Sequence, residues 1–142
     1  QLYFKVFDYE KVPTEVKKQN TILATCISGE LHEMGVRMLA DLFEIKGWDS
    51  HFLGANTPDK DLLGTIKEIK PDIVAISVTI MTNLKEATDL IQKLKQIEGK
   101  KPKILVGGFL FNVNPTLWKT IGADAMATNA KQAIKIAEDL IK

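Results

Sequence analysis

The sequence predicts an α/β fold with a flavodoxin-like (Rossmann-like) architecture: a five-stranded parallel sheet, in the order 2-1-3-4-5, with helices on both faces. Two observations lead to this prediction. From Thr21 onward, short apolar runs alternate with amphipathic stretches at helical spacing. Glycine and proline stand at many of the junctions between them. Strands separated by helices pair in parallel through right-handed crossovers, so the alternation itself selects this fold class.

Each element is predicted from its own pattern. Strands are expected where apolar residues come in short runs, at 21–26, 49–53, 73–78, 103–107 and 124–127. Helices are expected where apolar residues recur every three or four positions, at 33–46, 58–69, 82–97, 115–121 and 129–141. Gly47 follows the first helix, Pro58 stands near the start of the second, and Pro71 separates that helix from the third strand. No repeat or low-complexity tract interrupts the series.

The composition fits one soluble domain. The chain has 142 residues, of which 45% are hydrophobic, and a formal net charge of +1, so one sizeable core is expected. Lysines and acidic residues are mixed along the predicted helices, which disfavours nucleic-acid binding. No apolar run approaches the roughly 18 residues of a membrane-spanning helix. The single cysteine, Cys26, excludes an internal disulfide and, with no visible signal peptide, favours a cytoplasmic location.

Residues 1–20 differ from the rest of the chain. They hold a cluster of apolar and aromatic side chains, namely Leu2, Tyr3, Phe4, Val6, Phe7 and Tyr9. We expect this N-terminal aromatic arm to be covered, either by the domain's own surface or by a partner such as a second copy of the chain in a homodimer. The domain itself is expected at 21–142. The first residue is Gln rather than Met, so the chain is expected to be a fragment.

The loops that follow the strands should meet at one edge of the parallel sheet. They are small and neutral, and Ser77, Thr79, Gly107 and Gly108 are expected to line a slot between the third and fourth strands. A larger side chain at Gly108 is expected to block this slot while leaving the fold intact. The loops lack the acidic pocket of a phospho-acceptor receiver domain and any glycine-rich phosphate-binding motif. Alternatively, these residues only satisfy strand ends and form a tight turn.

One loop carries a longer signature. The segment from Glu30 to Gly35, Glu-Leu-His-Glu-Met-Gly, resembles the Asp-x-His-x-x-Gly motif of the cobalamin (vitamin B12)-binding domain family, with Glu30 in the place of the aspartate. The resemblance extends over 21–142, because a Ser-x-Thr follows the third strand at Ser77 and a Gly-Gly follows the fourth. The corrinoid-binding module of methionine synthase and the corrinoid methyl-carrier proteins are members of the family that the chain resembles.

The resemblance implies which residues hold the cofactor. His32 would be the lower axial ligand of cobalt in base-off cobalamin, and Glu30 would orient its imidazole. The displaced nucleotide tail would occupy the slot beside Ser77 and Gly108. The complete set of implied cofactor-binding residues is Glu30, Leu31, His32, Glu33, Met34, Gly35, Ser77, Thr79, Met81, Gly107, Gly108, Phe109 and Asn129. Without the resemblance, His32 could be an ordinary residue at a helix start, and His51 is expected to be structural.

The resemblance also implies the function. It indicates a cobalamin-binding module, either a corrinoid methyl carrier or a subunit of a methyltransferase system, in which the cofactor performs the chemistry. A protein partner, or a module ahead of residue 1, would cover the upper corrin face. The chain offers no independent nucleophile or acid–base pair, so we do not expect it to be an enzyme by itself. A cobalamin-dependent sensor, a flavodoxin-like module for another ligand such as a flavin, and an interaction domain without a ligand are the alternatives.

Overall fold

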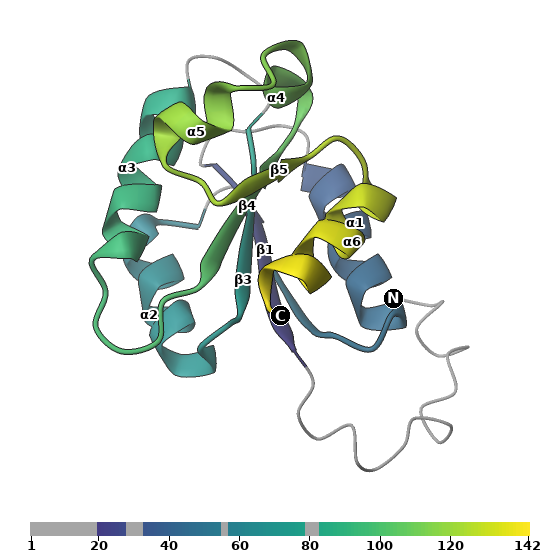
Figure 1. Cartoon of the computed structure of the whole chain (residues 1–142). Helices are drawn as coiled ribbons and strands as arrows, with labels where there is room; N and C mark the ends of the chain where they lie inside the picture. Colours follow the sequence, from purple (N-terminus) through teal and green to yellow (C-terminus); the bar gives the residue numbers. More distant parts are fainter. Residues whose placement is uncertain (1–19, 28–32, 55–56, 79–82) are drawn as a thin grey trace.

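The computed structural model describes residues 20–27, 33–54, 57–78 and 83–142. Within its helices, four side chains are not described, those of Glu33, Met34, Phe109 and Leu110. At its centre lies a five-stranded sheet in the order β2-β1-β3-β4-β5 (Figure 1). The strands are β1 (Thr21–Cys26), β2 (Asp49–Leu53), β3 (Ile73–Ser77), β4 (Lys103–Gly107) and β5 (Ala125–Ala127). Every pairing is parallel, which confirms the predicted fold class and strand order.

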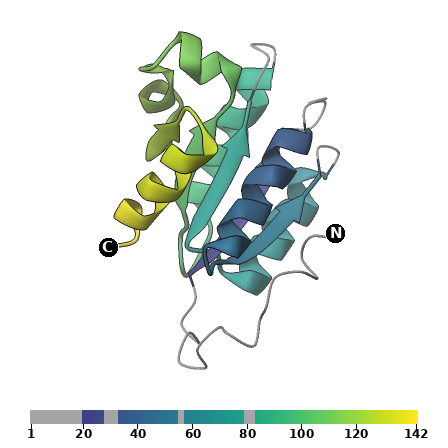
Figure 2. The same cartoon turned by 90° about the vertical axis from the view of Figure 1, so that its right-hand side faces the viewer.

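Helices form a layer on each side of the sheet. They are α1 (Glu33–Ile45), α2 (Asp59–Ile69), α3 (Leu84–Lys95), α4 (Phe109–Val113), α5 (Leu117–Ile121) and α6 (Ala130–Leu140). The helices α1 and α6 cover one face, whereas α2, α3 and α5 cover the other (Figure 1). Figure 2 looks onto the first face, with α6 (yellow) and α1 (dark blue) on either side of β3. None of the helices that the structure describes is long and apolar enough to span a bilayer.

The core lies on both sides of the sheet. In β1, Ile22 and Ala24 face α1 and α6, whereas Leu23 faces α2 and α3, and all three are fully buried. This alternation is the period of two of a strand that is covered on both faces. On the α1 side, Phe43 meets Trp48 edge to face, with ring centroids 5.0 Å apart. Burying a large apolar side chain of this kind contributes roughly 1.5–3 kcal/mol, so α1 is firmly fixed against the sheet.

Two carboxylates tie the amino ends of the strands together. Asp72, just before β3, accepts a hydrogen bond from the amide of Thr21 at the start of β1 (2.8 Å) and pairs with Lys100 (2.5 Å). Asp124, just before β5, accepts one from the amide of Ile104 in β4 (2.7 Å). Hydrogen bonds to charged groups are worth about 1.5–3 kcal/mol each. This edge of the sheet is therefore joined by side chains as well as by the backbone ladder.

The structure differs from the prediction after the fourth strand. The sequence predicts a loop at 107–109, but Phe109 begins the short helix α4. Gly108 turns the chain with a φ of +116°, the amide of Phe111 donates to the Gly108 carbonyl (3.1 Å), and Phe111 is fully buried. A helix of five residues is too short for its periodicity to be visible in the sequence. The bounds of the other elements agree with the prediction to within two residues.

Candidate functional site

The carboxyl ends of the strands form the second edge of the sheet. The register places Ser77 beside Cys26 on one side and beside Gly107 on the other, and Gly107 beside Ala127. The end residues of four strands therefore lie in a row, as parallel pairing requires. The loops that leave these strands begin from that row, so this edge is where residues from distant parts of the sequence meet.

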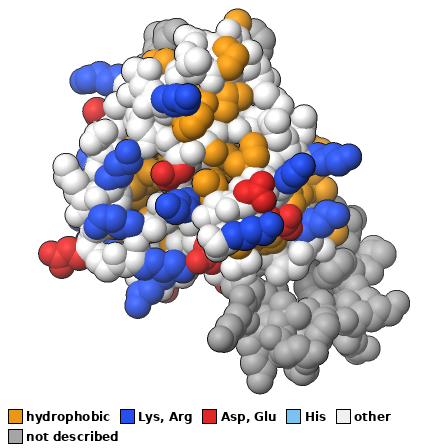
Figure 3. Space-filling model, viewed as in Figure 1, with side chains coloured by type: hydrophobic (Ala, Val, Ile, Leu, Met, Phe, Trp, Pro, Cys, Tyr) orange, Lys and Arg blue, Asp and Glu red, His pale blue; other side chains and the backbone are white. Residues whose placement is uncertain are grey.

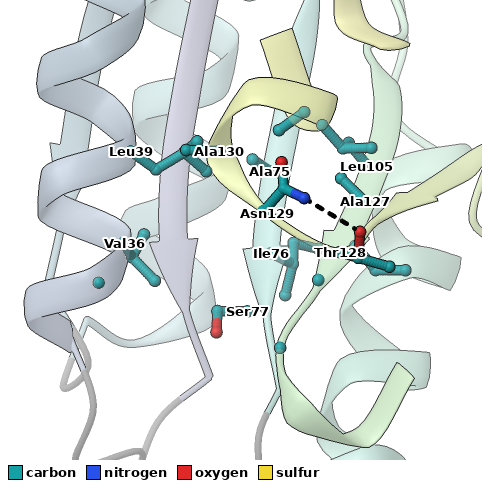
Figure 4. A pocket seen from close by; sticks show the side chains of 15 residues that line it. Val36, Leu39, Ala75, Ile76, Ser77, Leu105, Ala127, Thr128, Asn129 and Ala130 are labelled. Atoms are coloured by element: carbon teal, nitrogen blue, oxygen red, sulfur yellow. Dashed lines mark hydrogen bonds between the residues drawn. The ribbon is translucent and has the colours of Figure 1, made fainter. Parts of the chain in front are cut away.

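A cavity of about 300 Å³ lies at this edge, on the face that α1 and α6 cover (Figure 4). Its walls come from α1, from β3, β4 and β5, and from α6 with the turn that leads into it. Small residues occupy much of the wall, namely Gly35, Ala75, Ala127, Ala130 and Ala133. A Cβ added at Gly35 would have no atom within 4 Å. The cavity therefore exists because these residues are small. A pocket for a bulky ligand needs such open space.

Gly108 also lines the cavity, but the local backbone requires glycine at this position whether or not a ligand binds. Its φ is +116°, and a Cβ there would lie 2.5 Å from the carbonyl oxygen of Val78. The backbone of Val78 cannot easily move away, because its amide donates to the carbonyl of Gly107 (2.9 Å). The expectation that a larger side chain at Gly108 would leave the fold intact is therefore wrong. Changes at Gly108 cannot separate ligand binding from folding.

The polar groups of the cavity concentrate where β5 runs into α6. Asn129 caps α6, and its side-chain oxygen accepts a hydrogen bond from the amide of Gln132 (2.8 Å). The side-chain oxygen of Gln132 accepts in turn from the amide (2.6 Å) and the hydroxyl (2.8 Å) of Thr128. The side-chain amide of Asn129 donates to the same hydroxyl (3.4 Å; Figure 4). These three side chains are therefore joined by hydrogen bonds to one another and to the backbone of the turn. Ser77 lies across the cavity from them, at the end of β3.

Some of the predicted site residues line the cavity, and others lie outside the residues that the structure describes. Those that line the cavity are Gly35, Ser77, Gly107, Gly108 and Asn129. Those that lie outside the described residues are Glu30, Leu31, His32, Thr79 and Met81. Only the backbone is described for Glu33 and Met34 in the first turn of α1 and for Phe109 at the start of α4. The ligand role of His32 and the supporting role of Glu30 stay predictions.

The sequence-based prediction missed the inner wall of the cavity. Leu39, Leu105 and Ala133 line it, and none of them was predicted. Leu39 lies one helical turn after Gly35 on α1, and Leu105 lies two residues before Gly107 on β4, so each shares a face with a predicted residue. That spacing is the sequence signal that could have identified them.

None of the described residues that line the cavity is charged. Among the residues that the structure describes, no three His, Cys, Asp or Glu side chains come together as a protein-held metal ion requires. Partial burial and the neighbouring Glu44 raise the pKa of Asp41 on α1, but Asp41 does not line the cavity. His51 lies on β2 beside Asp49 (3.3 Å), also outside the cavity. The described part of the lining can therefore bind a largely apolar group, and no acid–base pair stands among its residues.

The chain matches a protein family and several of its characterised members. A family model described as the B12 binding domain matches residues 20–137. The chain is 29% identical over 130 residues to dimethylamine corrinoid protein 2 of Methanosarcina acetivorans, a match covering 90% of this chain and 59% of that protein. It is 30% identical over 129 residues to trimethylamine corrinoid protein 1 of Methanosarcina mazei, covering 89% and 58%. The chain thus spans about three fifths of the length of these relatives.

Solved structures share the fold. A cobalamin-binding protein from Desulfitobacterium hafniense has a TM-score of 0.78 at 28% identity, covering 88% of this chain and 60% of that one. The monomethylamine corrinoid protein of Methanosarcina barkeri has a TM-score of 0.74 at 22% identity, covering 93% and 65%. The methanol:cobalamin methyltransferase complex of the same organism has a TM-score of 0.70 at 22% identity, covering 85% and 46%. At 22% identity, these last two similarities concern the fold alone.

Proposed function

The chain belongs to the B12-binding domain family, whose ligand is cobalamin, and from this premise we propose that it is the corrinoid-binding module of a methyl-carrier protein. The cavity at the carboxyl edge of the sheet carries the proposal, because its wall begins at Gly35, three residues after His32 in the sequence. The bound cofactor would supply the methyl-transfer chemistry, and the protein would hold and orient it.

The cavity fits the nucleotide tail of cobalamin. Its small side chains leave room for a ring that a leucine or phenylalanine at the same positions would exclude. Ser77, Thr128 and Asn129 stand at the level where the strands end, which is where the tail would enter. The described lining residues carry no charge, which suits a base that carries none.

We assign the lower axial position of cobalt to His32, with the cofactor base-off. A neutral imidazole is a good ligand for cobalt, and a carboxylate on its second nitrogen fixes the tautomer and raises the basicity of the first. Glu30 is placed for that role by sequence, two residues before His32. Gly35, the third residue of α1, then adds no side chain on the cavity wall.

Similarity to methylamine corrinoid proteins favours a methyl carrier over the alternatives. The relatives named above are corrinoid proteins for dimethylamine and trimethylamine, and they extend well beyond the region that this chain matches. One of the solved structures that share the fold is that of a methanol:cobalamin methyltransferase complex. We therefore propose a methyltransferase subunit as the protein partner, acting on the upper corrin face. Methyl transfer to or from the loaded protein by such a subunit is the test, and a protein that binds cobalamin but exchanges no methyl group would support a sensor instead.

The visible spectrum of the protein after cobalamin is added tests the binding mode. The parent should bind the corrinoid in a base-off form with a histidine ligand, and His32→Ala should shift the spectrum toward a water-ligated form. The chain has one other histidine, so His51→Ala is the matched control and should leave the spectrum unchanged. A parent-like spectrum in His32→Ala would refute the ligand assignment. Failure of the parent to bind any corrinoid would refute the function itself.

The division into an arm at 1–20 and a domain at 21–142 belongs to the same proposal. The domain leaves apolar side chains open to solvent that an arm or a partner could cover, among them Met38, Leu42 and Ile45 on α1. Figure 3 shows further hydrophobic side chains between α5 and α6, with charged side chains around them. Deleting residues 1–10 should lower the melting temperature or change the elution volume in size exclusion. If both stay unchanged, the arm covers no surface of this domain.

A further inference from the structure

The cavity changes from polar to apolar with depth. At the level where the strands end, its lining includes Ser77 and Thr128. Two residues further back, the same face of the sheet carries Ala75 and its register partner Leu105, which are 4% and 2% exposed. A strand advances about 3.3 Å per residue, so this apolar level lies roughly 6–7 Å inside the mouth. Figure 4 shows Leu39, Ala75 and Leu105 on the inner side of Ser77 and Thr128.

The helices close this inner level with hydrocarbon as well. Val36 and Leu39 come from α1, and Ala130 and Ala133 come from α6. The backbone groups of β3 and β4 behind them are engaged in the parallel ladder of the sheet. A polar ligand atom that reached the inner level would therefore find no hydrogen-bond partner among the side chains described there.

The polar side chains of the β5–α6 turn cannot rotate inward without losing hydrogen bonds that they make there. The side-chain oxygen of Asn129 caps α6 through the amide of Gln132, and the side chain of Gln132 holds Thr128. Rotating Asn129 toward the inner level would uncap the helix. On this side of the cavity, the positions of the polar groups are thus fixed by the local structure of the β5–α6 turn.

From this gradient we propose that the cavity selects the base at the end of the corrinoid tail: it accepts a benzimidazole-type base and discriminates against a purine. The inference rests on the proposed function, because it requires the tail to occupy the cavity. Cobalamin ends in dimethylbenzimidazole, whose far side is hydrocarbon. Pseudocobalamin ends in adenine, whose far side carries an exocyclic amine and two further ring nitrogens. Burying these polar atoms against Leu39, Ala75 and Leu105 would leave them without partners.

Equilibrium binding of the two corrinoids, followed by their visible absorbance, tests the proposal. The parent should bind cobalamin at least about tenfold more tightly than pseudocobalamin. Free corrinoids also differ in how firmly their own base holds cobalt, so the decisive quantity is the change of this affinity ratio in a variant. Leu39→Asn keeps the branched shape of leucine and places an amide on the inner wall. It should lower the ratio about fivefold or more.

Leu42→Asn is the matched control. It makes the same change on the same helix, but Leu42 is 37% exposed and does not line the cavity, so the ratio should stay that of the parent. If Leu39→Asn does not fold, Val36→Thr repeats the test on the inner wall. The affinity ratio of the cavity variant is compared with that of Leu42→Asn. If it is lower by less than about fivefold, the proposal is overturned. A parent that binds neither corrinoid overturns the proposed function instead, so the two failures are distinguishable.

Discussion

At the amino edge of the sheet, aspartate side chains tie neighbouring strands together, whereas at the carboxyl edge, glycine and alanine residues leave space for a cavity. The first edge contains the bonds from Thr21 to Asp72 and from Ile104 to Asp124. The second contains Gly35 and Gly107 among the walls of the cavity. The stabilising side-chain bonds and the proposed binding site thus lie at opposite ends of the same strands. Changes at the amino edge should alter stability without altering cobalamin affinity. Changes inside the cavity should alter cobalamin affinity without altering stability.

The largest effect is expected from Gly35→Leu. The added side chain would enter the space that we assign to the cofactor, so cobalamin affinity should fall by at least about a hundredfold. Stability should not fall, because an added Cβ meets no atom within 4 Å and leucine favours the helix. Gly64→Leu is the matched control, since Gly64 is a helical glycine of α2 with the same open surroundings. Titration with cobalamin and thermal melting would measure both properties, and an unchanged affinity in Gly35→Leu would place the cofactor elsewhere.

Gly108→Ala should be the exception to the separation of the two edges. Its methyl group would press against the carbonyl of Val78 from a backbone with a φ of +116°. We expect a loss of about 2–4 kcal/mol in the free energy of unfolding, measured by denaturant titration. Gly35→Ala, which meets open space, should lose nothing comparable. Equal stability of the two variants would show that the close approach of Val78 relaxes without cost.

Asp72→Ala should break the amino edge alone. It removes the acceptor for the Thr21 amide and the partner of Lys100, so stability should fall by about 1.5–3 kcal/mol. Cobalamin affinity should stay that of the parent, because Asp72 lies at the far end of β3 from the cavity. Asp89→Ala, on the exposed surface of α3, serves as the control for removing one negative charge. A loss of affinity larger than the loss in the control would show that the two edges are coupled.

The smallest effect is expected from Glu30→Asp. A shorter carboxylate restores the usual family residue and has less rotamer freedom to lose, so it should hold the His32 imidazole more firmly. Protonation competes with cobalt for the imidazole as pH falls. His32 should therefore leave cobalt at a higher pH in the parent than in Glu30→Asp, by less than about one pH unit. Spectral titration of both proteins measures this, and detachment at the same or a higher pH in the variant would show that the difference between the two residues is silent.

The fold was predictable because strong local patterns coincide with a common topology. The alternation from Thr21 onward specifies both the elements and the parallel sheet. The helix α4 was not predictable, because it depends on the turn at Gly108 and on the burial of Phe111, which are tertiary features. The mouth of the cavity followed from the loops after the strands. Its inner wall was missed because Leu39 has the spacing of an ordinary core residue of an amphipathic helix. Only the structure shows that it borders a cavity.

The shortness of β5 has a consequence for local unfolding. This strand has three residues and pairs with β4 on one side only, yet it leads into α6, which forms a wall of the cavity. Few backbone bonds must break to release the last part of the chain, so amides of α6 should exchange with solvent through openings that leave the rest of the sheet folded. A ligand in contact with both α1 and α6 would connect the first helix with the last. Bound cobalamin should therefore slow hydrogen exchange in α6 more than in α3, which does not line the cavity.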